Sequence, residues 1–270
     1  MPTPLELVLD PISLTILALY AGLMLWEAVA PGRRLPRIAG STARGLLSFT
    51  AFFFLSSYLP LLWDARLAPY QLLDLTALGT AAGTVVGLLV YELGAWVWHR
   101  SLHAVPALWR GAHQMHHSAE RIDSYGAFYF SPLDMVGWTA LGSFCLVVGV
   151  GVSAEAATNI LIITNLLAIF QHTNVKTPRW LGYIVQRPES HTVHHGRGVH
   201  AGNYSDLPLF DIAFGTFVNP EGYELKTGFY DGASARVAEM IAMRDVTEPP
   251  AATEGSSPGD TALTPIHHSA

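Results

Sequence analysis

The residues of this chain that could do chemistry are histidines, and they recur in three short clusters. The clusters have the forms HxxxH, HxxHH and HxxHH, and consist of His99, His103, His113, His116, His117, His191, His194 and His195. On a helix, spacings of three and four place side chains on one face, where two imidazoles reach a common metal ion. A lone buried histidine is usually a hydrogen-bonded core residue, because neutral imidazole needs only one partner. Packing gives no reason to repeat the same spacing, so the clusters predict metal binding.

The composition is that of a membrane protein. Half of the 270 residues are hydrophobic, 13% are charged and the mean hydropathy is +0.31, whereas soluble domains have about a quarter charged residues. The net charge of -6 provides no basic surface for nucleic acid. Cys145 is the only cysteine, which excludes a disulfide framework and a cysteine-ligated zinc or iron-sulfur site.

Five apolar runs are candidates for membrane spans, since about 20 helical residues cross a bilayer core of about 30 Å. They lie near residues 12–30, 45–63, 75–98, 133–153 and 156–172. The fifth is short and only a few residues separate it from the fourth, so we expect these two to form a tight hairpin that need not cross fully. The predicted fold class is an all-α integral membrane protein with about four to five transmembrane helices and a cytosolic histidine-rich metal site.

Composition also divides the chain into segments. We expect N-terminal transmembrane helices, a histidine-containing catalytic domain with a membrane hairpin, an amphipathic helix on the membrane surface, and a disordered tail rich in Pro, Gly, Ser and Thr. The corresponding ranges are 1–74, 75–232, 233–245 and 246–270. His267 and His268 fall in the tail and are not expected to be ligands.

Charge placement predicts the orientation. The loop after the first apolar run carries Arg33, Arg34, Arg37 and Arg44, while the first 32 residues contain no Lys or Arg. The positive-inside rule therefore places this loop in the cytoplasm. Counting spans from there brings all three histidine clusters to the cytoplasmic side, which in a bacterium would be the cytoplasmic side of the inner membrane.

The strings HRSLH, HQMHHS and HTVHHG, followed by NYSDLPLFDIAFGTF, resemble the sterol desaturase and fatty acid hydroxylase superfamily of membrane oxygenases over roughly residues 85–220. The resemblance implies two iron ions at the cytosolic end of a helical bundle. It also implies the use of O2 and two electrons to hydroxylate, or desaturate, a lipid-like or sterol-like substrate. By the same resemblance the eight clustered histidines are ligands, together with His172 in the string FQHTN.

The chain departs from the family pattern at two positions. Many members have a His-Pro pair followed by an acidic residue where this chain has Ser131, Pro132, Leu133 and Asp134. Some fatty acid hydroxylases have a further histidine where this chain has Ala168. Whether Asp134 joins the site is therefore open, and so is the role of His200, which follows the third cluster without its spacing.

The chemistry of nine imidazoles leaves the metal open, because imidazole binds iron, zinc and copper, and nine are enough for two ions. Oxidising an unactivated C–H bond requires a redox-active metal, which zinc is not. A hydrolytic HExxH string is missing. The alternatives are a membrane zinc- or haem-binding protein without oxygenase activity and a zinc-dependent hydrolase. Adjacent histidine pairs fit axial haem ligation poorly.

Three acidic residues are candidates for supporting roles. Glu92 lies seven residues before His99, hence on the same helix face, and is interpreted as a catalytic-site partner of a ligand histidine or, alternatively, of an arginine. Asp211 and Glu189 flank the third cluster, where each would orient a ligand ring or cap a helix. Of these, Glu92 and Asp211 are the predicted catalytic residues.

The electrons must come from outside, because the chain has no Gly-rich dinucleotide fingerprint and no haem or iron-sulfur motif. The expected donor is a ferredoxin or small cytochrome with its reductase. Such acidic carriers would dock on basic residues around the clusters, namely Arg110, Arg121, Lys176, Arg179, Arg187 and Arg197.

Overall fold

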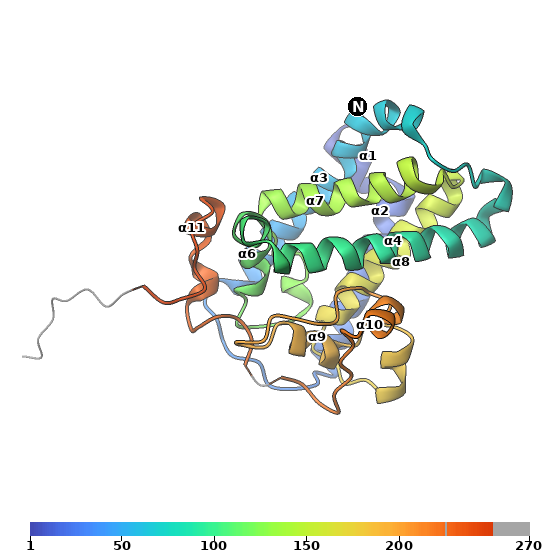
Figure 1. The fold of residues 1–270 in the computed structure, drawn as a ribbon. Helices are drawn as coiled ribbons and strands as arrows, with labels where there is room; N and C mark the ends of the chain where they lie inside the picture. Colours follow the sequence, from blue (N-terminus) through green and yellow to red (C-terminus); the bar gives the residue numbers. More distant parts are fainter. Residues whose placement is uncertain (225, 251–270) are drawn as a thin grey trace, which may run out of the picture.

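A computed structural model describes residues 1–224 and 226–250, and the chain is helical throughout most of this part (Figure 1). The described residues contain no strand, only isolated bridges between Pro31 and Val175 and between Gly196 and Thr227. The predicted all-α fold is confirmed. Of the tail predicted to be disordered, residues 251–270 lie outside the described residues.

Five helices are long and apolar enough to cross a membrane. They are α2 (Pro11–Val29), α3 (Ser41–Leu67), α4 (Gly79–Ala104), α7 (Pro132–Ser143) with its π-helical continuation Phe144–Val150, and α8 (Ala154–His172). These agree with the five predicted runs. The fifth, expected to be short, has 19 residues, the same length as α2, and so spans about 28 Å at 1.5 Å per residue.

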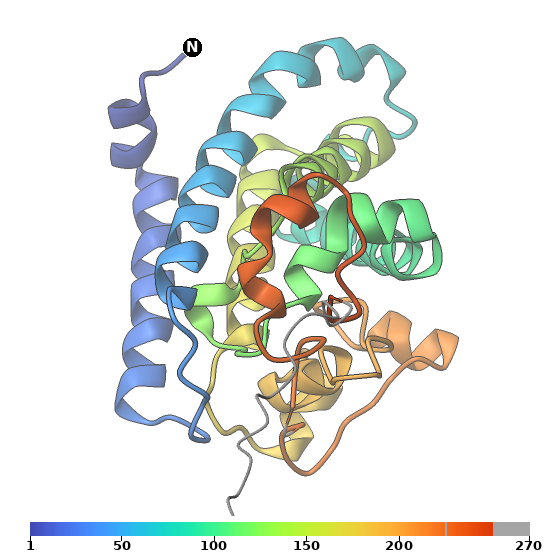
Figure 2. The ribbon, with the colours of Figure 1, turned by 90° about the vertical axis from the view of Figure 1, so that its left-hand side faces the viewer.

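The five helices are not all parallel. Helices α4 and α7 run side by side across the direction of α2 and α3 (Figures 1 and 2), and α8 packs against both α2 and α4. Glycines allow the close approach of α4 to its neighbours: a Cβ at Gly87 would lie 2.6 Å from Ile160 Cδ1, and one at Gly94 would lie 2.6 Å from Cys145 Sγ. Small residues at helix contacts are the usual means of packing helices in a membrane.

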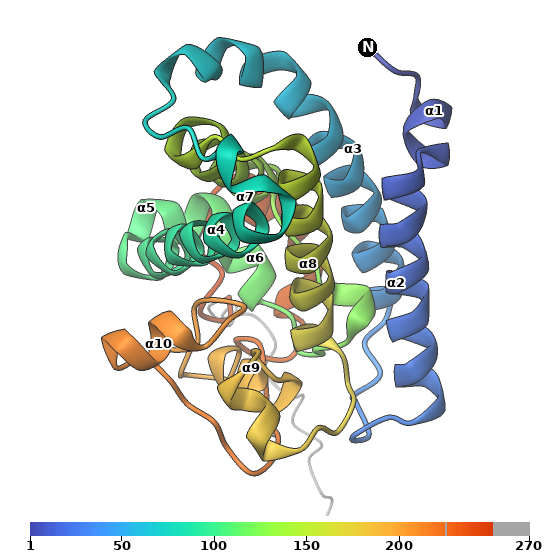
Figure 3. The ribbon, with the colours of Figure 1, turned by 90° about the vertical axis from the view of Figure 1, so that its right-hand side faces the viewer.

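The three histidine clusters lie at one end of this bundle, where α4 and α8 end. Val105 precedes Pro106, which disfavours helical backbone at Val105 and ends α4. The chain then turns back through α5 (Pro106–Leu108), a π-helical turn (Trp109–His113) and α6 (Gln114–His117). The third cluster lies on α9 (Pro188–His194), which with α10 (Leu209–Phe214) lies beneath the ends of α4 and α8 in Figure 3.

The arginine-containing loop lies at the same end. Gly32 N donates a hydrogen bond to Asn174 O at 2.6 Å, and Asn174 Nδ2 donates to Arg33 O at 2.7 Å. Asn174 follows His172 by two residues. The loop and the histidines are therefore together at one end of the molecule, as the predicted orientation requires.

The segment after residue 232 contains less helix than the sequence predicts. In place of one helix over 233–245 the structure has a 3-10 helix (Ala233–Ala235) and α11 (Val237–Ile241). Near the other terminus, a short helix α1 (Pro4–Leu9) precedes α2. Met240 is buried against Met115, and Gln114 Nε2 donates to Arg244 O at 2.7 Å. The segment covers α6, so its apolar side chains are used in part for packing rather than for the membrane surface.

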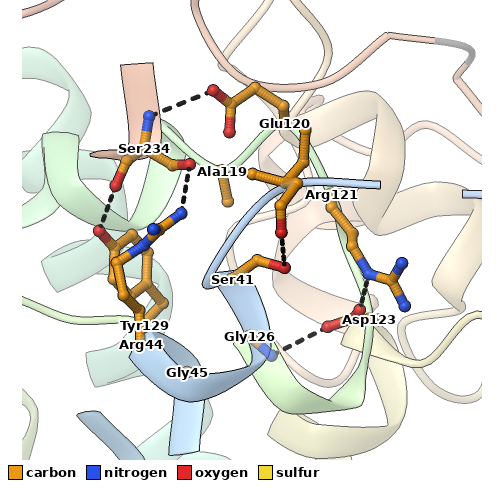
Figure 4. A pocket seen from close by; sticks show the side chains of 11 residues that line it. Ser41, Arg44, Gly45, Ala119, Glu120, Arg121, Asp123, Gly126, Tyr129 and Ser234 are labelled. Carbon is orange, nitrogen blue, oxygen red and sulfur yellow. Dashed lines mark hydrogen bonds and ion pairs between the residues drawn. The ribbon is translucent and has the colours of Figure 1, made fainter. Parts of the chain in front are cut away.

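A small pocket marks where this segment meets the first turn of α3 (Figure 4). Arg44 donates to Ser234 Oγ at 3.2 Å, and Tyr129 OH donates to Ser234 O at 2.7 Å. Glu120 accepts from the backbone N–H of Gly232 at 2.7 Å. These contacts tie the loop after the second cluster to both α3 and the C-terminal segment.

Candidate metal centre

All nine predicted histidines come together in two groups. The first group contains His99, His103, His113, His117 and His194, and the second contains His116, His172, His191 and His195. Within a group, one ring nitrogen of each residue lies within 4.8 Å of the others. Eight of the nine are buried and His103 is half-buried. The fold therefore assembles residues from α4, the π-helical turn, α6, α8 and the C-terminal end of α9 into one site.

Adjacent histidines serve different groups. His116 belongs to the second group and His117 to the first, while His194 belongs to the first and His195 to the second. Consecutive side chains on an α-helix are rotated by about 100° from each other. Each of the two HH pairs, one at α6 and one at the end of α9, thus contributes one ring to each group.

In the first group, hydrogen bonds fix which ring nitrogen carries the proton. His99 Nδ1 lies 2.8 Å from Tyr204 O, and His194 Nδ1 lies 2.6 Å from Gly202 O. A carbonyl oxygen only accepts, so each Nδ1 must be the donor. His113 Nδ1 lies 2.8 Å from the Asp134 carboxylate and donates to it in the same way. In a neutral ring the opposite nitrogen, Nε2, then presents a lone pair.

These lone pairs converge. His99 Nε2 lies 2.9 Å from His113 Nε2 and 3.1 Å from His194 Nε2, and no proton lies between these atoms when the rings are neutral. Metal–nitrogen bonds of about 2.0–2.1 Å at angles between 90° and 109° would separate two nitrogens by about 2.8–3.4 Å. The observed spacing fits that geometry, and a cation at the centre would remove the repulsion between the lone pairs. This spacing of the nitrogens leaves no room between the rings for a porphyrin, which axial haem ligation would require.

The second group has the same crowding with fewer fixed tautomers. His172 Nδ1 donates to Ala168 O at 2.7 Å, and its Nε2 lies 3.1 Å from His116 Nε2 and 3.0 Å from His191 Nε2. His195 Nε2 lies 3.1 Å from His191 Nε2. The buried Nδ1 atoms of His116, His191 and His195 have no hydrogen-bond partner among the described residues. This group is thus oriented more by packing than by hydrogen bonds.

The electrostatic setting keeps these rings neutral. Burial, followed by the charge of neighbouring histidines, lowers the pKa of His116, His117, His194 and His195 well below the usual 6.5. Burial is the first cause because a low-dielectric site disfavours the charged form. Neutral imidazole is the form that binds metals.

Asp134, whose role the sequence leaves open, contacts the first group through His113. It is fully buried in the first turn of α7, where Ser131 caps the helix and accepts from Asp134 N at 3.2 Å. The signal was present in the string Ser131-Pro132-Leu133-Asp134, a helix start that points a carboxylate back toward the preceding loop. What the string does not show is that His113 lies there.

The two acids predicted to be catalytic support the site indirectly. Glu92 accepts from Leu207 N at 2.9 Å, and Asp211 accepts from Tyr204 N at 2.9 Å and from Thr216 Oγ1 at 2.6 Å. Within the described residues neither carboxylate hydrogen-bonds any of the nine histidines, and Glu92 has no arginine partner. Instead they hold the segment 204–207, whose Tyr204 carbonyl orients His99.

Two further candidates are placed differently from each other. Glu189 accepts from Thr177 N at 2.8 Å and pairs with Arg187 at 3.2 Å, so it stabilises a loop rather than a histidine ring. His200 does reach the site, because its Nδ1 lies 3.1 Å from His117 Nδ1. Its backbone is left-handed, with φ of 42°, a conformation uncommon for a residue with a side chain.

Replacing Asp134 should weaken metal binding. We expect Asp134→Ala to lower metal affinity by about 10- to 100-fold, because the His113 ring loses the acceptor that fixes its tautomer. Asp134→Asn retains an acceptor oxygen and should lose less. Titration with a competing chelator measures the affinity. The matched control is Asp123→Ala, since Asp123 is also buried but pairs with Arg121; equal affinity in wild type and Asp134→Ala would contradict this role.

The fold and the two histidine groups thus define a helical membrane protein with a site of the kind that binds metal ions. Residues 84–216 match the fatty acid hydroxylase family. The part of the chain that contains the histidines therefore matches the family, and the resemblance predicted from the histidine strings is confirmed.

Two relatives are informative. The chain is 32% identical over 142 residues to the ornithine lipid hydroxylase OlsE of Rhizobium tropici, covering 50% of this chain and 42% of that protein. It is 33% identical over 138 residues to alkylglycerol monooxygenase of Danio rerio, covering 49% of this chain and 30% of that protein. The chain spans less than half the length of the curated relatives it matches. No solved structure matches it.

Proposed function

We propose that this protein is a membrane-bound di-iron oxygenase that hydroxylates a lipid-like substrate with O2. The observation that carries the proposal is the convergence of Nε2 atoms, 2.9–3.1 Å apart, in the first group. It occurs within a fatty acid hydroxylase domain beside five helices that could cross a membrane.

The first group would hold one ion and the second group the other. Bound iron would supply the redox chemistry for activating O2 and an alkyl C–H bond, which zinc lacks. The residues of this chain supply orientation: the Tyr204 and Gly202 carbonyls hold His99 and His194, and the Asp134 carboxylate holds His113. Burial of the second group excludes water from that part of the site.

The substrate class rests on the relatives and on the membrane setting. Both relatives are named for oxidation of lipids, and a helical bundle in the membrane has direct access to such molecules. Both names also describe oxygen insertion, which favours hydroxylation over desaturation. The two outcomes diverge only in whether oxygen is inserted or a second hydrogen is removed, which depends on sub-ångström placement of the substrate.

The electron donor would be a separate protein docking on the exposed basic residues near the histidines. Arg110, Lys176 and Arg179 are exposed, and Arg121 and Arg197 are half-buried. Arg187, which the sequence also predicts for this face, is fully buried against Glu189, so that prediction is wrong for this residue. Its neighbours Pro188 and Glu189 are also buried, because α9 faces the histidine site.

Lipid analysis of the host, with and without the gene, tests the function. We expect one lipid class to lose a species heavier by one oxygen when the gene is deleted. Wild-type protein should restore that species and His194→Ala should not, because His194 belongs to the first group. Identical lipid profiles with and without the gene, in cells that produce the protein, would rule out this function.

The same proposal includes a cytoplasmic site and therefore predicts the topology. Reporter fusions after Arg37, after Ala119 and after Phe217 should all report the cytoplasm. A fusion within residues 64–74, at the far end of α3, should report the opposite side. The reason is the arginine-containing loop, which lies at the histidine end of the molecule. A periplasmic signal after Ala119 would reverse the orientation.

A further inference from the structure

A pocket of about 510 Å³ opens from the surface to the first histidine group. Its walls include the last turns of α4, the loop around residue 202 and the segment 215–218. His103 lines it and is the one member of the nine that is not fully buried. A molecule approaching the first group from outside would therefore reach it past His103.

The walls of this pocket are firmly held. Asn203 has a left-handed backbone with φ of 53°. Its Nδ2 donates to Ser190 O and to Val218 O, both at 3.0 Å, and its Oδ1 accepts from Val218 N at 2.8 Å. A Cβ at Gly202 would lie only 2.8 Å from Thr216 O. Since Gly202 O also binds His194, the pocket wall is connected directly to the first group.

Arg100 lies at this pocket with an ordered but unpaired side chain. Its guanidinium carbon lies 5.1 Å from the centre of the Trp96 ring, and Trp96 Nε1 donates to Thr216 Oγ1 at 3.1 Å. Within the part of the chain that the structure describes, no carboxylate lies within ion-pair distance of Arg100. Stacking on an aromatic face orients a guanidinium while leaving its N–H groups available to an anion.

Apolar side chains flank Arg100 on two helices. Val97 lies one turn earlier on α4 and is 51% exposed, and Phe214 of α10 is 51% exposed. The Phe214 ring lies 4.3 Å from the Trp96 ring, so α10 continues the apolar surface of α4 up to the pocket. A cation at the end of a spanning helix, bordered by exposed apolar residues, is the arrangement found at the level of lipid headgroups.

We propose that this pocket is the lipid entrance and that Arg100 binds an anionic group, phosphate or carboxylate, of the lipid headgroup. The inference rests on the proposed function, because it assigns a lipid to the same site. The pocket walls are suited to a headgroup rather than to a hydrocarbon chain: they present a guanidinium, two imidazoles, a phenol, a hydroxyl and glycine peptide groups. The lipid chains would lie along the apolar surface of α4 and α10.

Binding without turnover tests the proposal. Purified full-length protein in non-ionic detergent micelles is titrated with three probes: dioctanoylphosphatidic acid, which carries a phosphate; N-decanoylglycine, which carries a carboxylate; and dioctanoylglycerol, which is uncharged. Native mass spectrometry measures the bound fraction. We expect at least one anionic probe to bind about tenfold more tightly than the uncharged one, a difference of about 1.4 kcal/mol. The probe that shows the preference identifies the anion.

Arg100→Gln should reduce the affinity for that anionic probe to the level of the uncharged probe, and Arg100→Lys should retain part of the preference. The matched control is Arg66→Gln, because Arg66 is also in the last turn of a spanning helix and donates only to the Leu62 carbonyl. A wild type without preference for either anionic probe would overturn the proposal. So would an equal loss in Arg100→Gln and Arg66→Gln, which would indicate attraction to the micelle surface only.

The outcome is separable from that of the proposed function. Arg100-dependent binding in a protein that oxidises no lipid would leave the headgroup site standing while the oxygenase assignment fails. If the protein oxidises a lipid and Arg100→Gln leaves the KM for that lipid unchanged, the headgroup site is contradicted while the proposed function stands. Metal content, measured on each variant, checks that the first group is intact.

Discussion

Purified His194→Ala protein should fall from about two metal ions per chain to one or fewer, and its lipid oxidation should fall by at least about 100-fold. His194 is held by Gly202 O and contributes one of the three converging Nε2 atoms. Loss of the partner that orients a ligand already costs about 10- to 100-fold, so removal of the ligand itself should cost more. His116→Ala should have the same effect through the second group. Metal analysis of the purified variants gives the stoichiometry.

The control for these variants is His267→Ala, which lies outside the described residues and is not predicted to be a ligand. It should retain the metal content of the wild type. The same analysis identifies the metal, and iron is expected; zinc as the sole metal in protein from iron-replete cells would favour the non-oxygenase alternative. Full metal content in both His194→Ala and His116→Ala would mean that the two histidine groups are structural.

Purified protein supplied with O2, NAD(P)H and a lipid extract should remain inactive until a reductase and a ferredoxin or small cytochrome are added. The given sequence contains no dinucleotide fingerprint and no haem or iron-sulfur motif, which is why we propose that another protein delivers the electrons. The rate gained on addition should be essentially the whole activity. Product formation by mass spectrometry, with each component omitted in turn, measures it.

Docking on basic residues adds a salt dependence to this prediction. The reduction rate should fall as ionic strength rises from about 0.05 to 0.3 M, because exposed charges are screened within about 10 Å at 0.1 M. Lys176→Gln should slow reduction, because Lys176 belongs to the exposed basic residues on which the donor would dock. Arg66→Gln should not, because Arg66 lies at the end of α3 that is far from the histidines. Turnover with NAD(P)H alone, or a rate indifferent to salt, would disprove this account of electron supply.

The histidine groups were predictable from sequence because local spacing carries the information. His99 and His103 are four residues apart on α4, and His191 and His195 are four apart at the end of α9; each of these pairs lies within one group, because residues four apart share a helix face. The partition of the nine into groups of five and four was not predictable. It depends on how α4, α6, α8 and α9 meet, which is set by long-range packing.

For the acidic residues, too, local spacing does not predict the long-range contacts. Glu92 was placed on the correct helix face by its spacing from His99, yet its hydrogen bond goes to Leu207 N, 115 residues away in sequence. The sequence does not decide whether Asp134 joins the site, yet Asp134 contacts His113 directly. Apolar runs located the five spanning helices within a few residues, but they carry no information on the crossing of α4 and α7 over α2 and α3 (Figure 2).

The division of adjacent histidines between the two groups means that the backbone links the two groups covalently and limits the distance between them. His116 and His117 are joined by a single peptide unit, and so are His194 and His195, and successive Cα atoms are about 3.8 Å apart. The His117 and His195 rings also stack, with centres 4.2 Å apart. A residue of one group therefore cannot move far without displacing its covalently bonded neighbour in the other group. If the two groups hold metal ions, a change in the ligand geometry of one ion would be transmitted through these links to the ligands of the other.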